Sequence, residues 1–356
     1  MRNLFSTATA ALIAMAACSQ AQSQPVNRND PWRPEDHPEL AGLRAERRAI
    51  ALERKKLMQW PDGLRVLRNL DYVPNNHESA HKLDIFIPEN KTKNPLTLIV
   101  HVHGGGWSAG DKEQEHLFIP LLNRGYAVAT INYRLSHEAL WPAQIYDCKA
   151  AIRWLREHAH EYGYDPNKIG VWGESAGGHL VAMLGTTSGD PAMEGNVGDL
   201  HVSSKVQAVC DWFGPTDLVT LPRQSELAVA AQHSGKATAR GFTEELLGGR
   251  VEDHKAEAKQ ASPITYVTSS CPPFLIMHGD RDTLVPPSQS QELYDALRAK
   301  NVDATFKIVA GAGHAGAYFQ RYGERKMVWE FFDAKLKGVH SIGSAQTPSM
   351  LNHAIR

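Results

Sequence analysis

The sequence predicts an α/β fold: a mostly parallel sheet of about eight strands with helices on both faces and a small insertion. Three observations predict it. Short apolar runs, which suit strands buried on both faces, alternate with segments of helical periodicity along most of the chain. Glycine-rich turns follow several of these runs. The first two strand-like segments alternate polar and apolar residues, which is typical of an antiparallel sheet edge.

The segments follow one another in a simple order. After residues 1–21 and a polar tether with a helix at 22–63, one α/β catalytic domain is expected at 64–338, before a tail at 339–356. A stretch at 216–262 is too long for a simple connection, so it is interpreted as a cap over the site. Strands are expected at Leu64–Tyr72, Lys82–Ile87, Leu96–Val102, Tyr126–Tyr133, Lys168–Trp172, Val206–Phe213, Phe274–His278 and Thr305–Val309, and helices at Ile145–His160, Gly178–Thr186, Ser288–Lys300 and Met327–Leu336.

The N-terminus has the composition of an export signal. Arg2 precedes a small apolar run at 8–17, which is too short to cross a bilayer. Two processing routes stay open: cleavage after Ala21, or acylation of Cys18, whose preceding residues are similar to a bacterial lipobox. We therefore expect an exported protein (periplasmic, outer-membrane-anchored or extracellular) that meets a membrane only through a lipidated Cys18.

Composition narrows the function classes. The chain has 356 residues, and its formal net charge of −1 gives no electrostatic reason to expect nucleic acid as a partner. Neither a His-Glu-x-x-His nor a Cys-x-x-Cys pattern occurs, so no metal and no other cofactor is expected. Cys148, Cys210 and Cys271 are expected to be buried and reduced.

The strongest chemical signal is the run from Gly173 to Gly178, Gly-Glu-Ser-Ala-Gly-Gly, which follows a predicted strand and opens a predicted helix. Such a strand-to-helix turn, the nucleophile elbow, strains its serine, and only small residues two before and two after it avoid clashes. The turn exposes the hydroxyl of Ser175, and the helix N-terminus favours negative charge developing nearby. Ser175 is therefore the predicted nucleophile.

A second glycine-rich run, His103-Gly104-Gly105-Gly106-Trp107, directly follows the predicted strand Leu96–Val102. Because glycine has no side chain, its backbone N–H groups can point inward unobstructed. The N–H groups of Gly105, Gly106 and Ala176 are predicted to form an oxyanion hole. His103 is interpreted as a structural residue that ties the loop.

An acid and a base complete the constellation at two later strand ends. Asp282 and His314 each follow a predicted strand, where open α/β sheets place their sites. A serine hydroxyl needs a base, and that histidine needs a carboxylate to fix its tautomer. Asp217 is the alternative acid, although a turn or helix-cap role suits it better, and Asp280 is interpreted as a turn residue.

Aromatic side chains near the predicted loop ends are candidates for binding substrate. Together they would line an apolar or aromatic-binding cleft. They are Trp107, Trp141, Trp212 and Tyr318.

At these motifs the chain resembles the hormone-sensitive-lipase-like branch of the α/β-hydrolases, and within it the exported bacterial feruloyl and acetyl xylan esterases. The resemblance runs from about Leu64 to about Gly338 and also rests on Asn132-Tyr133-Arg134-Leu135. Glu174 departs from it, because many lipase-like members have Asp there. The resemblance implies the α/β-hydrolase fold and an esterase acting on carbohydrate-linked esters.

We therefore expect a serine esterase that cleaves short-acyl or aromatic esters through an acyl-enzyme at Ser175. An arylformamidase, a peptidase-like amide hydrolase and a lipase-like esterase are the alternatives among enzymes. An inactive binding module on the same fold is the alternative of another class. The mixed charges of the insertion, including Arg240 and Glu244, speak against a broad apolar lipase lid.

Overall fold

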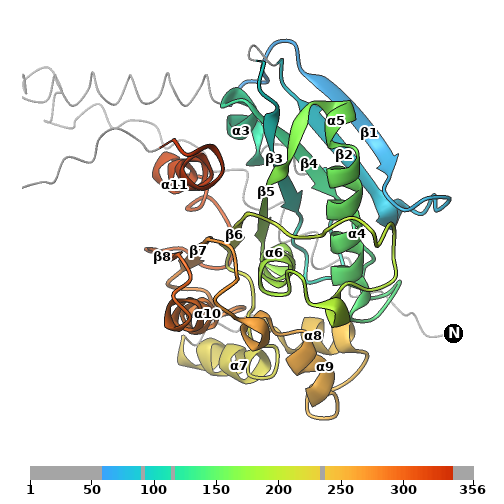
Figure 1. The fold of residues 1–356 in the computed structure, drawn as a ribbon. Coiled ribbons are helices and arrows are strands. Elements are labelled where there is room, and N and C mark those ends of the chain that lie inside the picture. Colours follow the sequence, from blue (N-terminus) through green and yellow to red (C-terminus); the bar gives the residue numbers. More distant parts are fainter. Residues whose placement is uncertain (1–57, 90–92, 114–116, 233–236, 340–356) are drawn as a thin grey trace, which may run out of the picture. The chain divides into compact units, whose positions relative to one another are not determined.

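The computed structural model describes residues 58–89, 93–113, 117–232 and 237–339. Within them, eight strands form one sheet in the order β1-β2-β4-β3-β5-β6-β7-β8 (Figure 1). The β1–β2 and β2–β4 pairs are antiparallel and all later pairs are parallel, which confirms the predicted sheet. The strands are β1 (Arg65–Asp71), β2 (Lys82–Ile87), β3 (Leu96–Val102), β4 (Tyr126–Ile131), β5 (Tyr164–Glu174), β6 (Ala208–Trp212), β7 (Phe274–Gly279) and β8 (Ala304–Val309).

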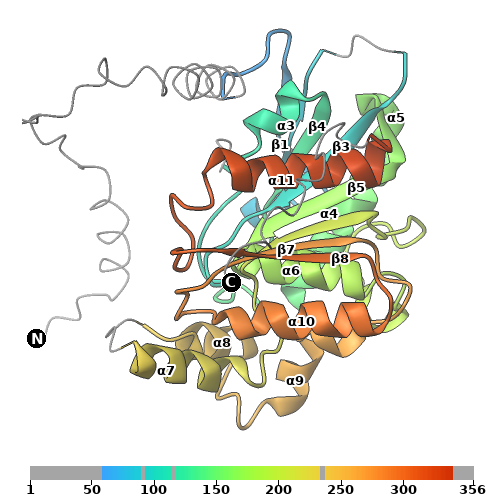
Figure 2. The same cartoon turned by 90° about the vertical axis from the view of Figure 1, so that its left-hand side faces the viewer.

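Helices cover both faces of the sheet. Figure 2 shows α11 on one side of the sheet and α6 and α10 on the other. Successive side chains of β3 enter different apolar clusters, Val100 and Val102 on the α6 face and Ile99 on the α11 face, because side chains alternate along a strand. The helices are α3 (Ile119–Asn123), α4 (Ala143–Glu157), α5 (Ala159–Tyr162), α6 (Ala176–Thr186), α7 (Leu221–Ala231), α8 (Arg240–Leu247), α9 (Lys255–Gln260), α10 (Pro287–Ala299) and α11 (Tyr322–Phe332).

Some element limits differ from the predicted ones. The segment expected as one helix over Ile145–His160 is two helices, α4 and α5. The strand expected at Lys168–Trp172 begins at Tyr164, which pairs with the first residue of β3 and donates its hydroxyl to a carbonyl of α4. The helix expected at Met327–Leu336 begins five residues earlier, at Tyr322, and passes into a π turn, Asp333–Lys337. Pairing and capping contacts, which periodicity does not report, decide these limits.

The insertion at 216–262 holds α7, α8 and α9. Arg240 opens α8 and pairs with Glu226 of α7 at 2.6 Å and with Glu244 of its own helix. The ring of Phe242, also on α8, lies against the glycine-rich loop, since a Cβ placed on Gly106 would come 2.6 Å from it. Part of the insertion therefore covers the predicted oxyanion loop.

Several expectations fall on residues that the structure does not describe. These are the signal at 1–21 with Cys18, most of the segment 22–63, and the tail after residue 339. Among the described residues, no helix is long and apolar enough to span a membrane. Cys148 and Cys210 are buried free thiols as expected, whereas Cys271 is free but only half-buried, because it lies in the turn before β7.

Candidate active site

Ser175 sits at the sharp turn between β5 and α6. Its φ of 55° and ψ of −121° are strained for a residue with a side chain. Backbone bonds hold the turn, because Ser175 N–H donates to Trp212 O at 2.9 Å and His179 N–H donates to Ser175 O at 2.9 Å. The flanking glycines are required by space: a Cβ on Gly177 would come 2.0 Å from Val102 O. The predicted elbow is thus a packed junction of β5, α6 and β3.

Three side chains from distant loops meet beside this turn. Ser175 Oγ lies 2.8 Å from His314 Nε2, and His314 Nδ1 lies 2.6 Å from Asp282 Oδ2. Since a carboxylate can only accept, Nδ1 carries the proton and Nε2 is left to accept the hydrogen bond of the serine hydroxyl. The Phe213 ring packs against the imidazole in a T-shaped arrangement, with centroids 5.0 Å apart. The structure therefore brings together the three residues that the sequence singled out.

Asp282 is buried and fully hydrogen-bonded. Its Oδ1 accepts the N–H groups of Leu284 and Val285, at 2.9 and 3.0 Å. Burial acts to raise the pKa of this carboxyl, but the adjacent His314 and His278 outweigh it and lower the pKa to about 2. Asp282 is thus an ionised carboxylate across the neutral range, as an orienting partner for His314 requires.

The other two candidate acids serve turns, as expected. Asp217 is bonded to Val219 N–H and to the hydroxyl of Thr220. Asp280 Oδ1 accepts the N–H of Gly311 at 2.7 Å, which ties the loop that carries His314. Neither carboxylate bonds to His314.

Two buried residues beside the site escaped the sequence reasoning. His278, at the end of β7, donates Nε2–H to Val285 O at 2.7 Å, and the same nitrogen lies 3.2 Å from Asp282 Oδ2. Asp211, on β6, accepts Gly214 N–H through Oδ1, while its buried Oδ2 has no partner in the described part of the chain. Burial raises the pKa of Asp211 to about 6. His278 opens the run His-Gly-Asp-Arg-Asp that ends at Asp282, so its place four residues before the predicted acid could have indicated it. No sequence pattern singles out Asp211.

The glycine-rich loop has the backbone shape that an oxyanion hole needs. Gly105 and Gly106 have φ of 114° and 61°, values that suit glycine. Gly104 packs on the elbow, since a Cβ there would come 2.7 Å from the backbone oxygen of Glu174. In the described residues, no hydrogen bond to a protein acceptor occupies the N–H of Gly105, Gly106 or Ala176. These three donors are available to a ligand.

His103 ties the loop as expected. Its Nδ1–H donates to Gly104 O at 2.8 Å, and its ring stacks on Tyr133, whose hydroxyl donates to His103 O at 3.0 Å. Burial lowers the pKa of His103 to about 4, so the ring is neutral near pH 7.

The aromatic lining expected from the sequence is largely core. Trp212 is buried with its ring against Trp172 at a centroid distance of 4.9 Å, so it is not a cleft residue. Trp107 and Trp141 are also buried, and their indole N–H groups are bonded to His179 and Gln260. These three tryptophans correct the expectation, because large apolar side chains at strand and loop ends gain more by packing inward. Tyr318 alone of the four is exposed, at 38%.

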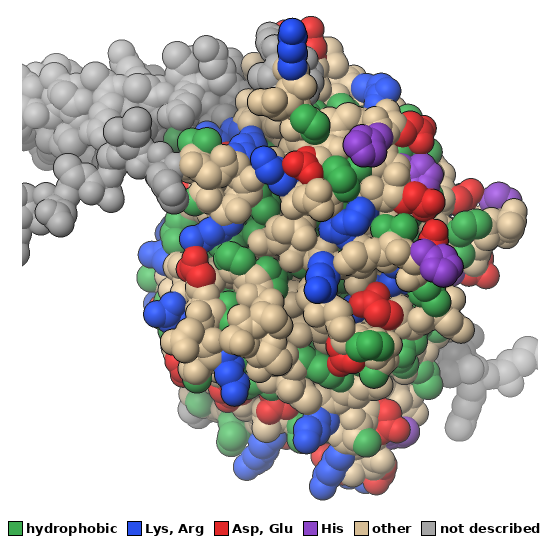
Figure 3. All heavy atoms as spheres, in the orientation of Figure 1, with side chains coloured by type: hydrophobic (Ala, Val, Ile, Leu, Met, Phe, Trp, Pro, Cys, Tyr) green, Lys and Arg blue, Asp and Glu red, His purple; other side chains and the backbone are tan. Residues whose placement is uncertain are grey.

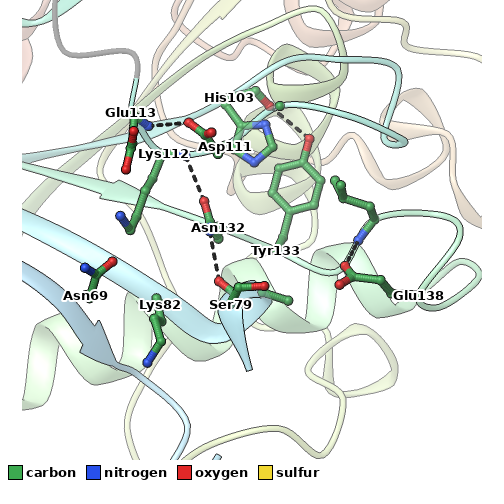
Figure 4. A pocket seen from close by; sticks show the side chains of 13 residues that line it. Asn69, Ser79, Lys82, His103, Asp111, Lys112, Glu113, Asn132, Tyr133 and Glu138 are labelled. Atoms are coloured by element: carbon green, nitrogen blue, oxygen red, sulfur yellow. Dashed lines mark hydrogen bonds between the residues drawn. The ribbon is translucent and has the colours of Figure 1, made fainter. Parts of the chain in front are cut away.

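A polar pocket of ≈ 320 Å³ is lined in part by His103, Asp111 and Tyr133 (Figure 4). Its cations are already neutralised within the protein: Lys82 bonds to Asp71, and Lys112 bonds to the buried Asp84. Ser175 does not line this pocket, so we do not expect a substrate of Ser175 to bind in it. On the face drawn in Figure 3, acidic and basic side chains are interspersed, which gives that face no electrostatic footprint for nucleic acid.

Comparison with known proteins identifies the family of the chain. The BD-FAE family model matches residues 83–297. The chain belongs to the BD-FAE family. Esterase LipQ of Mycobacterium tuberculosis is 33% identical over 254 residues, which cover 69% of this chain and 56% of LipQ, and esterase LipC of the same organism is 30% identical over 72% of this chain and 65% of LipC. The chain thus spans roughly three fifths of these curated relatives.

Solved structures of other proteins are also similar to this BD-FAE family member. A truncated carbohydrate esterase from gut microbiota superposes with a TM-score of 0.69 at 33% identity, covering 78% of this chain and all of that one. A bifunctional GH43-CE protein of Bacteroides eggerthii has a TM-score of 0.67 at 34% identity, covering 76% of this chain and 35% of its own. The expected α/β-hydrolase fold and likeness to carbohydrate esterases are confirmed.

The acid can be tested by paired substitutions. We predict that Asp282→Asn lowers kcat by about 10⁴-fold, because an amide would hold His314 in the wrong tautomer. Asp217→Asn, which alters an exposed turn, should stay within about threefold of wild type. Steady-state kinetics on one aryl ester would compare them, and a larger loss for Asp217→Asn would assign the acid to that residue.

The buried Asp211 predicts a pH-dependent stability difference. Its folded pKa is raised, so its carboxyl is neutral in the folded state at low pH and the protein loses stability as pH rises from about 4 to about 6. Asp211→Asn removes this titration. The free energy of unfolding of the variant relative to wild type should rise by about 3 kcal/mol over that range, since one pKa unit is about 1.4 kcal/mol. Urea unfolding at pH 4, 5, 6 and 7 would measure it, and a pH-independent difference would contradict the buried titration.

Proposed function

We propose that this protein is a serine carboxylic ester hydrolase in which Ser175, His314 and Asp282 act as nucleophile, base and orienting acid. One observation carries the proposal: the hydrogen-bonded chain from Ser175 Oγ through His314 to Asp282, beside backbone N–H groups left without protein acceptors. The esterase names of LipQ and LipC and the carbohydrate esterase neighbour support it.

The geometry supports a two-step acyl transfer. Ser175 Oγ attacks the ester carbonyl carbon while its proton passes to His314 Nε2, and the charge formed on the carbonyl oxygen is accepted by N–H groups of Gly105, Gly106 and Ala176. The C–O bond to the alcohol then breaks, and the alcohol leaves with the proton from His314. A water repeats the sequence on the acyl-enzyme, releasing the carboxylic acid and restoring Ser175.

For the substrate we propose short-acyl or aromatic esters linked to carbohydrate. The carbohydrate esterase neighbour supports the alcohol side. Phe242 packs directly on Gly106, which limits the space beside the oxyanion loop. We further propose that the protein is exported, because residues 1–21 have the composition of an export signal.

A covalent label tests the nucleophile. We predict that a fluorophosphonate probe modifies wild-type protein at one equivalent and that Ser175→Ala takes no label. The same variant should lose about 10⁶-fold in kcat, as loss of a triad nucleophile does elsewhere. Circular dichroism should show its fold unchanged. Wild-type protein that neither reacts with the probe nor turns over an ester would instead be a binding module.

The acyl preference tests the substrate class. On p-nitrophenyl esters we expect kcat/KM to peak between acetate and butyrate and to fall by octanoate, because each methylene adds under about 1 kcal/mol only while the pocket has room. Acetylated and feruloylated xylan should also be cleaved. A maximum at decanoate or longer, with rates that rise on emulsified substrate, would identify a lipase.

A further inference from the structure

His179 is a buried residue on the first turn of α6 whose two ring nitrogens are both bonded. Nδ1 lies 3.1 Å from the indole nitrogen of Trp107, and Nε2 lies 2.6 Å from Ala261 O. An indole N–H only donates and a carbonyl only accepts, so the tautomer is fixed with the proton on Nε2. Burial lowers the pKa of His179 to about 4, which keeps the ring neutral in the working range.

These bonds join three segments that are far apart in sequence. Trp107 ends the glycine-rich loop, His179 lies four residues after Ser175, and Ala261 closes the insertion. The oxyanion donors come from two of these segments, the loop and the start of α6. A donor stabilises the transition state only when it points at the developing charge, so the relative position of the two segments matters.

Trp107 also needs to be held. Its φ of 59° is left-handed, in a run with Gly105 and Gly106, and such a conformation costs about 1–3 kcal/mol for a residue with a side chain. Its carbonyl accepts Ser136 N–H at 2.8 Å, and its indole is bonded to His179. One restraint acts on the backbone and the other on the ring, so both ends of Trp107 are fixed.

We propose that His179 is a positioning residue: through Trp107 it keeps the N–H groups of Gly105 and Gly106 in register with that of Ala176. This rests on the proposed esterase function. His179 does not contact the reacting atoms in this role. It sets the geometry of the hole, and through Ala261 it ties that geometry to the insertion.

Breaking the bond should act mainly on the transition state. Removal of one whole oxyanion donor costs about 10²–10³ in kcat, so displacement of the loop should cost less, about 10- to 100-fold, with KM nearly unchanged. Trp107→Phe removes the N–H that reaches His179 and leaves an aromatic ring in place. Trp329→Phe is the matched control, because Trp329 is a buried indole on α11, which covers the opposite face of the sheet.

The experiment measures kcat, KM and the inhibition constant of an arylboronic acid, which mimics the tetrahedral intermediate, for wild type, both Phe variants and His179→Leu. For Trp107→Phe we expect kcat and boronate affinity to fall together while KM stays within about threefold; Trp329→Phe should match wild type. In the double variant Trp107→Phe/His179→Leu, the loss should be no larger than in the worse single variant, because both remove the same bond.

Several outcomes would overturn the proposal: Trp107→Phe with wild-type kcat, a loss confined to KM, boronate affinity that does not follow kcat, or additive losses in the double variant. If Trp107→Phe or His179→Leu does not fold, His179→Gln and His179→Ala are compared instead. Glutamine keeps one acceptor and one donor, so His179→Gln should retain a higher kcat than His179→Ala when the two variants have the same melting temperature. Absence of ester turnover in wild type would reject the esterase function itself, which is a different result.

Discussion

The close contact of the elbow with its neighbouring strands is the constraint on which the site depends. Ser175 holds a strained conformation, and it can do so only because α6 packs wholly inside the protein and starts almost in contact with β3. The carbonyl oxygens of Val102 and His103 both lie within reach of Gly177, so no larger residue fits there. The same contact that strains the serine also brings the glycine-rich loop, which follows β3, beside its hydroxyl.

The pKa values of two buried carboxyl groups near this junction are shifted in opposite directions by their surroundings. Asp282 accepts bonds from two backbone N–H groups and two histidines, and its pKa falls. Asp211 accepts one backbone N–H, has a buried oxygen without a described partner, and its pKa rises. Burial acts to raise the pKa of both carboxyls, but only at Asp282 do adjacent histidines, His314 and His278, outweigh it. His278 contributes to this contrast, because its N–H is directed at Asp282 and at Val285 O.

Much of this arrangement can be predicted from the sequence, because the apolar runs that form strands and the glycines of the turns after them are local features. The eight strands, the elbow, the glycine-rich loop and the meeting of Ser175, Asp282 and His314 all follow from turns placed after buried strands. The neighbours against which a side chain packs are not a local feature of the sequence. Trp212 looks like a cleft residue from its place at a strand end, but it packs against Trp172 on the neighbouring strand. His179 gave no signal, since its partners lie 72 and 82 residues away.

The insertion contacts the framework of the proposed active site at two points. Phe242 packs on Gly106, and Ala261 accepts the bond from His179. Leu246 and Leu247 of α8 are buried in the hydrophobic core. Arg240, at the start of the same helix, forms an ion-pair group with Glu226, Glu244 and Glu252. Such partly exposed pairs contribute little each, and the insertion can be altered in its charged parts at small cost in stability. Its contacts with Gly106 and His179 are different, because a shift there would move the N–H groups that we propose as oxyanion donors. For the proposed esterase we therefore expect substitutions in the charged outer parts of the insertion to change the substrate range, and substitutions at the two contacts to change kcat.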